Sequence, residues 1–573
     1  MSKPLYRSSS SGKSNLLVLN DLLIALGLAL LAAFVFWTTP EFAASLPQDA
    51  PDYAIPAVNL LERGRLVVSA YGHDFPPAHP PGMPLLLLPS YILFGYFPGN
   101  GIYAVLLCSV STVVLTYIIG VKLGGRLCGC SAALFLIAHH GFWQFSRKIM
   151  SEVPSALFGI AVFALLLKIR DRKRPGLACL AIGAILGFAI TIRNDNVLLL
   201  VPAALLLAWE GAGRERLQRV GLTLVGMVPF LIGLAVYDQV TFGSPWRTGY
   251  HYWGGAGSAK RPLFSAGYIT KSGFLRLVPI IDPKNAEGNG TLLIKSLLDQ
   301  SDTTQIFGLG AGALWHLPGF RLYQTVVLLR TTLGAIGLLA CLVGWRTNRL
   351  RQRFLLWLVL ITFAYVGFFL MYYYRDERFL VRLVPVFCLA DGVGVAALLA
   401  KWPSKCARAT VLVVVGALIG RFMLWNAQMG FPTGDQQGIY ETLTWVASQI
   451  EPNAVVVSNF SPLWVDAYII HGTHRIAVPL GHKYEIPVFI GGDLTPTFIS
   501  PFVASRDPER LRELLHSGLP VYWLIESPWR EQAADELETL ARSFRLTALA
   551  SAKSRSRADH PFFGRVDDLP QQH

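Results

Sequence analysis

Two aspartates, Asp49 and Asp52, follow an apolar run that ends near Trp37 and is long enough to cross a bilayer. A carboxylate at a membrane surface is partly desolvated and can act as a general base toward a hydroxyl group. An aspartate beside a proline or an apolar run is also a common first residue of a helix, where it caps backbone N–H groups. The sequence around Asp49 and Asp52 leaves both roles open.

Glu152 is another acid close to an apolar run, in the segment Ser151-Glu152-Val153-Pro154. It could orient an acceptor hydroxyl or a basic partner, or it could be a helix-start acid that the helix dipole favours. Arg193 stands where a further apolar run ends. Its guanidinium could bind a phosphate, or it could pair with Asp195 or cap its own helix.

Arg375 and Arg378 precede a later apolar run. Arginine binds phosphate oxygens through paired hydrogen bonds, so both are candidates for stabilising a phosphate leaving group. The alternative for Arg378 and for Arg382 is that they anchor the helix by extending to lipid headgroups.

His79 stands before Pro80-Pro81 and could contact substrate or could be only a turn residue. An aromatic patch follows near residue 250 and could stack on a sugar or form an interfacial aromatic belt. Its members are Trp246, Tyr250, Tyr252 and Trp253, interleaved with Arg247 and His251.

The histidines, acids and seven cysteines show no spacing that would suit zinc, and no glycine-rich phosphate loop follows a predicted strand. The cysteines lie in apolar segments or beside basic loops, and none lies in the first large loop or in the C-terminal region. No disulfide framework is therefore predicted for those two parts of the chain. We therefore expect no cofactor, and a divalent metal is not indicated.

The composition predicts a polytopic α-helical membrane protein. Of the 573 residues 53% are hydrophobic and only 15% are charged, and the mean hydropathy is +0.45. A soluble domain has roughly a quarter charged residues. The net charge of +14 comes from Lys and Arg at the ends of apolar segments, so membrane topology explains it better than nucleic-acid binding.

A Ser-rich tail, residues 1–15, precedes a first apolar run over 16–37 that we interpret as a retained helix, since no small-residue cleavage site follows. Further spans bring the total to about eleven. They are expected near 101–120, 127–145, 154–169, 176–192, 196–209, 219–237, 322–343, 354–372, 383–400 and 409–426.

Basic clusters fall in alternate loops, all on the side of the N-terminus, and the positive-inside rule makes that side the cytoplasm. An odd number of helices then places the C-terminus outside. The clusters include Lys122, Arg126, Lys168, Arg170, Arg219, Arg349, Arg353 and Lys405.

The resulting organisation is a cytoplasmic tail (1–15), a membrane module (16–430) with large outer loops at about 38–100 and 238–321, and an extracytoplasmic domain (431–573). Met83 to Phe94 is apolar but short and bracketed by prolines, so we expect an interfacial or re-entrant helix. A true span there would invert everything downstream.

Helical and strand patterns alternate after residue 431, which predicts a small α/β domain with a largely parallel sheet. Helices are expected at 440–450, 508–516 and 531–544, and strands at 454–458, 475–479 and 521–525.

Four segments, in order, resemble the GT-C class of membrane glycosyltransferases, nearest to the protein O-mannosyltransferases and the lipid A aminoarabinose transferase. They are Asp49-x-x-x-Tyr53 with the later Pro80-Pro81-Gly82, Ser151-Glu152-Val153-Pro154, Thr191-Ile192-Arg193-Asn194, and Arg375 to Phe379 followed by Leu383 to Pro385. Two positions depart from the pattern. Many relatives have a second acid where this chain has Ala50, and often a basic residue where it has Asp52.

The resemblance implies a polyprenyl-phosphate sugar as donor, presented on the outer face of the membrane. Asp49 would be the general base, with Asp52 as its rival, and transfer would be inverting. Glu152 would orient groups in the site, and the phosphate would meet Arg193, Arg375 and Arg378. Tyr53, His79, Trp246, Tyr250 and His251 would be further substrate contacts. The acceptor could be a protein, a lipid or a glycan.

Two other classes of function compete. A transporter or flippase of lipid-linked saccharides would carry ionisable groups at mid-membrane and internal repeats. We see no repeat, and the acids and arginines singled out lie at helix ends on one side. A non-catalytic scaffold would leave those clustered charges without a role.

Overall fold

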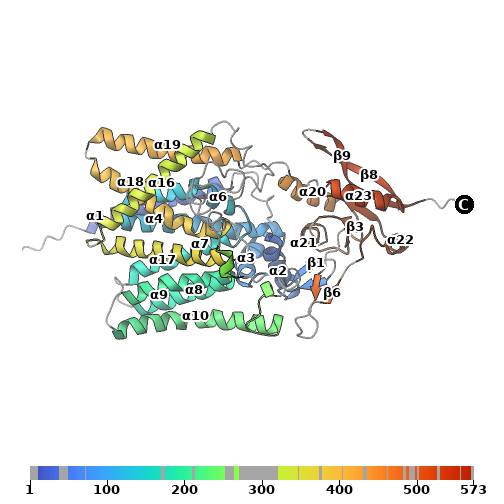
Figure 1. The fold of residues 1–573 in the computed structure, drawn as a ribbon, viewed down its shortest axis with the longest axis horizontal. Coiled ribbons are helices and arrows are strands. Elements are labelled where there is room, and N and C mark those ends of the chain that lie inside the picture. The colour runs from blue at the N-terminus through green and yellow to red at the C-terminus, as the bar shows by residue number, and fades with distance from the viewer. Residues whose placement is uncertain are drawn as a thin grey trace, which may run out of the picture.

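The chain consists of a helical bundle and a smaller part that contains a β-sheet (Figure 1). The computed structural model describes residues 11–569 with gaps, the largest of which are 38–48, 252–263 and 270–319. The predicted outer loop at 238–321 therefore falls mostly outside the described residues.

The bundle is built from long apolar helices. Seven stretches within the described residues are long and apolar enough to cross a membrane, and the chain is accordingly a multi-pass membrane protein. These stretches are Leu19–Trp37, Pro98–Gly124, Pro175–Ile192, Gly213–Phe242, Arg349–Met371, Arg378–Lys401 and Lys405–Leu424. The other predicted spans do not meet this criterion over the residues described, so the total of eleven stays a prediction.

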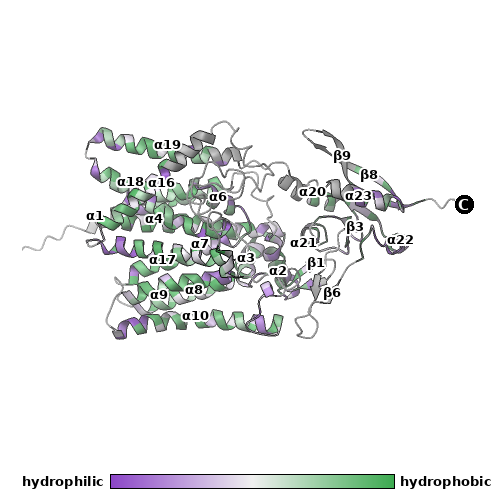
Figure 2. Ribbon diagram, viewed as in Figure 1, coloured by the Kyte–Doolittle hydropathy of each residue, from purple (hydrophilic) through white to green (hydrophobic). Residues whose placement is uncertain are grey.

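The bounds of the bundle helices follow the predicted spans closely. They are α1 (Ser11–Trp37), α4 (Ile102–Gly124), α5 (Arg126–Ala138), α6 (His140–Phe145), α7 (Glu152–Lys168), α8 (Pro175–Ile192), α9 (Leu200–Trp209), α10 (Gly213–Phe242), α16 (Phe320–Val343), α17 (Arg349–Met371), α18 (Val384–Lys401) and α19 (Lys405–Met429). Figure 2 shows that apolar residues dominate along these helices.

The prediction of one continuous span over 127–145 is wrong. The chain turns at His139, whose backbone is extended and whose Nδ1 accepts a hydrogen bond from the Phe142 N–H at 3.3 Å. The ring thus caps a new short helix, α6, and the polar pair His139-His140 before Gly141 is the point in the sequence where the helix breaks.

The first outer loop carries α2 (Ala50–Arg63), the short strands β1 (Val68–Ala70) and β2 (His73–Phe75), and α3 (Gly82–Phe94). With 13 residues, α3 is about 20 Å long and too short to cross a hydrocarbon core about 30 Å thick. Its first residue, Gly82, lies so close to the backbone of Thr191 and Ile192 that a side chain would collide with it. This contact fixes the loop against the end of α8.

A buried ion pair joins α16 to α18. The Arg330 Nε donates to Asp391 Oδ2 at 3.1 Å, Nη2 reaches the Cys388 sulfur at 3.4 Å, and both charged side chains are almost fully buried. Both residues lie near the middle of their helices. The sequence analysis did not single out either residue, and the pair shows that opposite charges can be kept inside the bundle when they neutralise each other.

The C-terminal part contains a five-stranded sheet of order β4-β3-β7-β9-β8. Its strands are β3 (Val455–Ser458), β4 (Ile476–Pro479), β7 (Val521–Leu524), β8 (Phe544–Ser554) and β9 (Arg557–Asp568). Strand β3 pairs in parallel with β4 and β7, whereas β9 is antiparallel to β7 and β8. The sheet is thus mixed, and the predicted largely parallel sheet is wrong for the hairpin β8–β9.

Helices flank this sheet and tie it to the first outer loop. They are α20 (Asp435–Gln449), α21 (Pro462–Val465), η7 (Asp466–Ile470), α22 (Pro508–His516) and α23 (Arg530–Ala541), and a separate ribbon pairs β5 (Ile486–Val488) with β6 (Thr497–Ile499). Helix α21 contacts α2 and β1, and the rings of Phe97 and Tyr468 lie 5.5 Å apart. The sheet therefore lies on the same side of the bundle as α2 (Figure 1).

The Arg330–Asp391 pair gives a stability prediction. Replacing Asp391 by Leu leaves a buried guanidinium without its carboxylate, which should destabilise the bundle by about 3–5 kcal/mol. Thermal unfolding in detergent measures the effect. The double variant Arg330→Met, Asp391→Leu is the control and should recover most of the loss, since apolar side chains of similar volume replace both charges. A double variant as unstable as the single one would contradict this account.

Candidate active site

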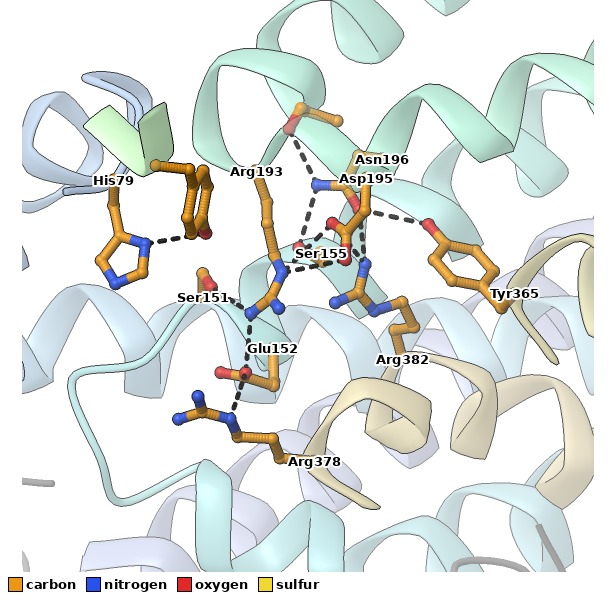
Figure 3. Close-up of polar contacts among 12 residues, drawn as sticks. His79, Ser151, Glu152, Ser155, Arg193, Asp195, Asn196, Tyr365, Arg378 and Arg382 are labelled. Atoms are coloured by element: carbon orange, nitrogen blue, oxygen red, sulfur yellow. Dashed lines mark hydrogen bonds and ion pairs between the residues drawn. The ribbon is translucent and has the colours of Figure 1, made fainter. Parts of the chain in front are cut away.

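Arg193 lies at the centre of a cluster of charged side chains at one end of the bundle (Figure 3). Helix α8 ends at Ile192, and Arg193 then takes an extended backbone conformation before the turn η3 (Asn194–Leu199). This turn directs its side chain toward the start of α7. The Arg193 Nη1 donates to Glu152 Oε1 at 2.8 Å, and Nε donates to Asp195 Oδ1 and Oδ2, each at 3.1 Å.

Glu152 is fully buried in the first turn of α7, where the helix dipole also favours an acid. Its Oε1 accepts from Arg193, whereas its Oε2 is buried without a hydrogen-bond partner among the described residues. A buried carboxylate oxygen without a donor is costly, and such atoms mark places where a ligand can bind.

Asp195 joins Arg193 to a second arginine. The Arg382 Nη1 donates to Asp195 Oδ1 at 2.9 Å, and its guanidinium lies 4.8 Å from the ring centre of Tyr365. Arg382 is only 3% exposed. The alternative that Arg382 extends to lipid headgroups is therefore wrong, because this side chain turns into the bundle to meet Asp195.

Asp49 forms an ion pair with Arg378, whose Nη1 lies 2.7 Å from Asp49 Oδ2. Asp49 occupies the N-cap position of α2, as the helix-start alternative predicted, but its side chain caps no backbone N–H and instead pairs with Arg378. Burial is the largest single influence and raises the pKa of Asp49, but the charge and hydrogen bond of Arg378, together with the charges of His79 and Arg193, outweigh burial and hold that pKa below its usual range. Asp49 is therefore a carboxylate at neutral pH.

Asp52 lies one turn along α2 in a different environment. Its Oδ1 is buried without a hydrogen-bond partner among the described residues, and its Oδ2 is 4.0 Å from His79 Nε2. Burial, followed by the negative charge of Asp49, raises the pKa of Asp52 to about 7. The two aspartates thus differ in protonation although they are three residues apart.

His79 links the first outer loop to the segment after α10. Its Nδ1 lies 2.9 Å from the Tyr250 hydroxyl, and its ring stacks on Tyr53 with 4.6 Å between centres. Burial lowers the pKa of His79 to about 4, so the imidazole is neutral at neutral pH. The Tyr53 hydroxyl is 3.2 Å from Ser151 Oγ, which brings this group beside Arg193 and Glu152.

The structure brings together most of the residues singled out in the sequence, but not all. Trp246 is 85% exposed, and His251 hydrogen-bonds locally to Thr248, so of the aromatic patch only Tyr250 is shown to reach the cluster. Arg375, Tyr252 and Trp253 lie outside the described residues.

Asn196 was missed by the sequence analysis. It is fully buried, donates to Ser155 Oγ at 3.0 Å and accepts from Arg382 at 3.3 Å. Its position directly after Asp195 is the one feature of the sequence that could have indicated a role for Asn196 in the cluster.

The cluster suits acid–base chemistry on a phosphorylated substrate. With Asp52 protonated, three carboxylates (Asp49, Glu152, Asp195) face three guanidinium groups (Arg193, Arg378, Arg382). Among the described residues, no group of three His, Cys, Asp or Glu side chains is arranged to hold a metal ion.

Part of the chain matches a known family. Residues 78–237 match the family model of dolichyl-phosphate-mannose-protein mannosyltransferases, from the residue before His79 to a point within α10. No curated protein matches the whole sequence significantly.

Two solved structures of ArnT from Cupriavidus metallidurans have the same fold. The apo state is 13% identical, with a TM-score of 0.53 over 96% of this chain and 98% of that one. The state bound to undecaprenyl phosphate is 14% identical, with a TM-score of 0.52 over the same shares. The chain thus shares the fold of ArnT, and residues 78–237, which include Glu152, Arg193 and Asp195 of the charged cluster, are similar to the mannosyltransferase family.

Proposed function

We propose that the chain transfers a sugar from a polyprenyl-phosphate donor to an acceptor hydroxyl at the Asp49–Arg378 pair. The observation that carries this proposal is the 2.7 Å contact between a carboxylate and a guanidinium at one end of a membrane bundle. A base and a phosphate-binding cation are thereby neighbours. The ArnT structure that contains undecaprenyl phosphate supports a lipid of that kind as the carrier.

The chemistry would be a single displacement. Asp49 accepts the proton of the acceptor hydroxyl while the oxygen attacks the anomeric carbon, and the bond from that carbon to the phosphate oxygen breaks. The lipid phosphate leaves with the bonding electrons, so the anomeric configuration inverts. Arg378 and Arg193 then stabilise the added negative charge, and Arg375 is a further candidate.

Glu152 and the first outer loop would position the reactants. The partnerless Glu152 Oε2 can accept a hydrogen bond from a substrate hydroxyl, while Oε1 keeps Arg193 in place. The Tyr53–His79–Tyr250 group would form a wall of the sugar site, and its neutral rings offer stacking faces.

In the proposed orientation this end of the bundle and the sheet domain face outward, because the basic clusters lie at the opposite helix ends. Transport of lipid-linked saccharides is set aside as the leading activity. The mid-bundle charges that could favour it, Arg330 and Asp391, neutralise each other.

The decisive experiment is radiolabelled transfer. Membranes with and without the protein are incubated with a panel of polyprenyl-phosphate sugars, and label is measured in protein, lipid and glycan fractions. We expect label from at least one donor in one fraction, only when the chain is present. Label that stays in the donor pool with every sugar would contradict the proposal.

Asp49 and Asp52 can be separated by the pH dependence of transfer. A general base works when deprotonated, so a base with the lowered pKa of Asp49 stays active as the pH falls from 7 to about 5. Asp49→Asn should lower kcat by about 10²–10⁴-fold, whereas Asp52→Asn should keep most activity.

The opposite outcome would be an acid limb near pH 7, where Asp52 titrates, with the rate falling about tenfold per pH unit below it. If that limb vanished in Asp52→Asn, Asp52 and not Asp49 would be the base.

Arg378→Ala should weaken donor use more than acceptor use, because the lost guanidinium is proposed to bind the donor phosphate. We expect KM for the donor to rise at least tenfold with a smaller change for the acceptor, and Arg378→Lys to recover part of the loss. Steady-state kinetics with each substrate varied provides the test. An unchanged donor KM in Arg378→Ala would remove Arg378 from the phosphate site.

A further inference from the structure

Arg382 is a buried cation to which the proposed transfer assigns no role. It lies in η6 (Glu377–Leu383), directly before α18, and is only 3% exposed. Its guanidinium lies over two rings of α17, 4.8 Å from the centre of Tyr365 and 5.9 Å from that of Phe369. A donor phosphate would find almost none of this side chain accessible, so an effect of Arg382 on transfer must pass through its neighbours.

The hydrogen bonds of Arg382 go to η3. Nη1 donates to Asp195 Oδ1 at 2.9 Å and to Asn196 Oδ1 at 3.3 Å, whereas Nε and Nη2 are buried without a hydrogen-bond partner among the described residues. A buried ion pair adds little stability over apolar side chains of the same size, and unmet N–H groups cost free energy. The property of Arg382 that needs an explanation is therefore the charge that it brings to Asp195.

Asp195 lies between two guanidinium groups (Figure 3). Its Oδ1 accepts from Arg382 at 2.9 Å and from Arg193 Nε at 3.1 Å, and its Oδ2 accepts from the same Nε. Arg193 also faces a second carboxylate, that of Glu152, at 2.8 Å. With Arg382 removed, two carboxylates would share the one guanidinium of Arg193, and their field would oppose an incoming phosphate.

Arg193 is the more accessible of the two arginines that Asp195 joins, with 9% of its surface exposed. Its Nε donates to Asp195, and its Nη1 donates to Ser151 and Glu152. Its Nη2 makes no hydrogen bond to any residue that the structure describes. This nitrogen is thus left for a phosphate oxygen, provided that the two carboxylates do not outweigh the charge of Arg193.

We propose that Arg382 is a positioning residue of the transfer site, which neutralises Asp195 and so leaves the charge of Arg193 to the donor phosphate. The inference rests on the proposed function, because it takes the donor phosphate to bind at Arg193. Arg382 itself touches no substrate and acts through Asp195.

Binding of undecaprenyl phosphate to the purified full chain in neutral detergent tests the inference without a transfer step. Arg382→Gln loses the charge but keeps an N–H for Asp195, and it should weaken binding on the order of tenfold, measured by native mass spectrometry. Arg382→Lys keeps the charge and should retain most of the binding. In transfer assays Arg382→Gln should raise the donor KM more than the acceptor KM.

A double variant separates charge balance from a structural role. Arg382→Gln with Asp195→Asn also removes the uncompensated carboxylate, so it should bind undecaprenyl phosphate more tightly than Arg382→Gln alone. If Arg382 were only structural, the second substitution would add its own loss. Should Arg382→Gln not fold, the double variant is compared with the wild type, and a loss of tenfold or more would overturn the inference.

The matched control breaks the other buried arginine–aspartate pair. Arg330→Met leaves Asp391 unpaired between α16 and α18, away from the cluster, so it should lower the unfolding temperature but keep undecaprenyl phosphate binding. Full binding in Arg382→Gln, or equal loss in Arg330→Met, would overturn the inference and leave the proposed function standing. A wild-type chain that binds no undecaprenyl phosphate would overturn both.

Discussion

The buried guanidinium of Arg193 is the group on which the arrangement of the site depends. A charge taken out of water must be matched by opposite charge and by hydrogen bonds. Glu152 and Asp195 supply both at 2.8 and 3.1 Å. Because Glu152 begins α7 and Asp195 lies in η3, directly beyond Arg193, satisfying Arg193 fixes the corner between α8 and η3 against the start of α7. Asp195 in turn holds Arg382, and Arg378 lies 4.0 Å from Glu152.

Residues near one another in sequence were the easiest part of this cluster to predict. The pairing of Arg193 with Asp195 needed only the local sequence, and it was weighed as the alternative to phosphate binding. In the structure Arg193 pairs with Asp195 and also contacts Glu152 in the charged cluster. The contact between Asp49 and Arg378 spans 329 positions, so only a resemblance to known proteins could place them in one site. The charge and hydropathy patterns of the sequence do not predict how far apart the side chains of Asp49 and Arg378 lie.

Other features could not be predicted from the sequence because they depend on contacts between segments that are far apart in the chain. The break at His139 depends on a ring that caps the next helix, and the hairpin β8–β9 depends on pairing with β7. The Arg330–Asp391 pair was hidden because a single charge inside an apolar run does not reveal its partner on another helix. The long apolar helices and the strands β3, β4 and β7 could be predicted, since each is encoded by a continuous local pattern.

The departure at Asp52, together with the neighbouring His79, bears on how such a site would bind a phosphate. Relatives often carry a basic residue at the position of Asp52 and a polar or basic one at that of His79. Here these side chains lie 4.0 Å apart, the imidazole is neutral and the carboxyl has a pKa of about 7. Neither supplies positive charge to an incoming phosphate. In the cluster as described, the guanidinium groups are those of Arg193, Arg378 and Arg382, and each is paired with a carboxylate. In the proposed function a donor phosphate would draw on Arg193 and Arg378. Binding of a donor phosphate would compete with Asp49 for Arg378 and so release the base beside the acceptor as the donor arrives.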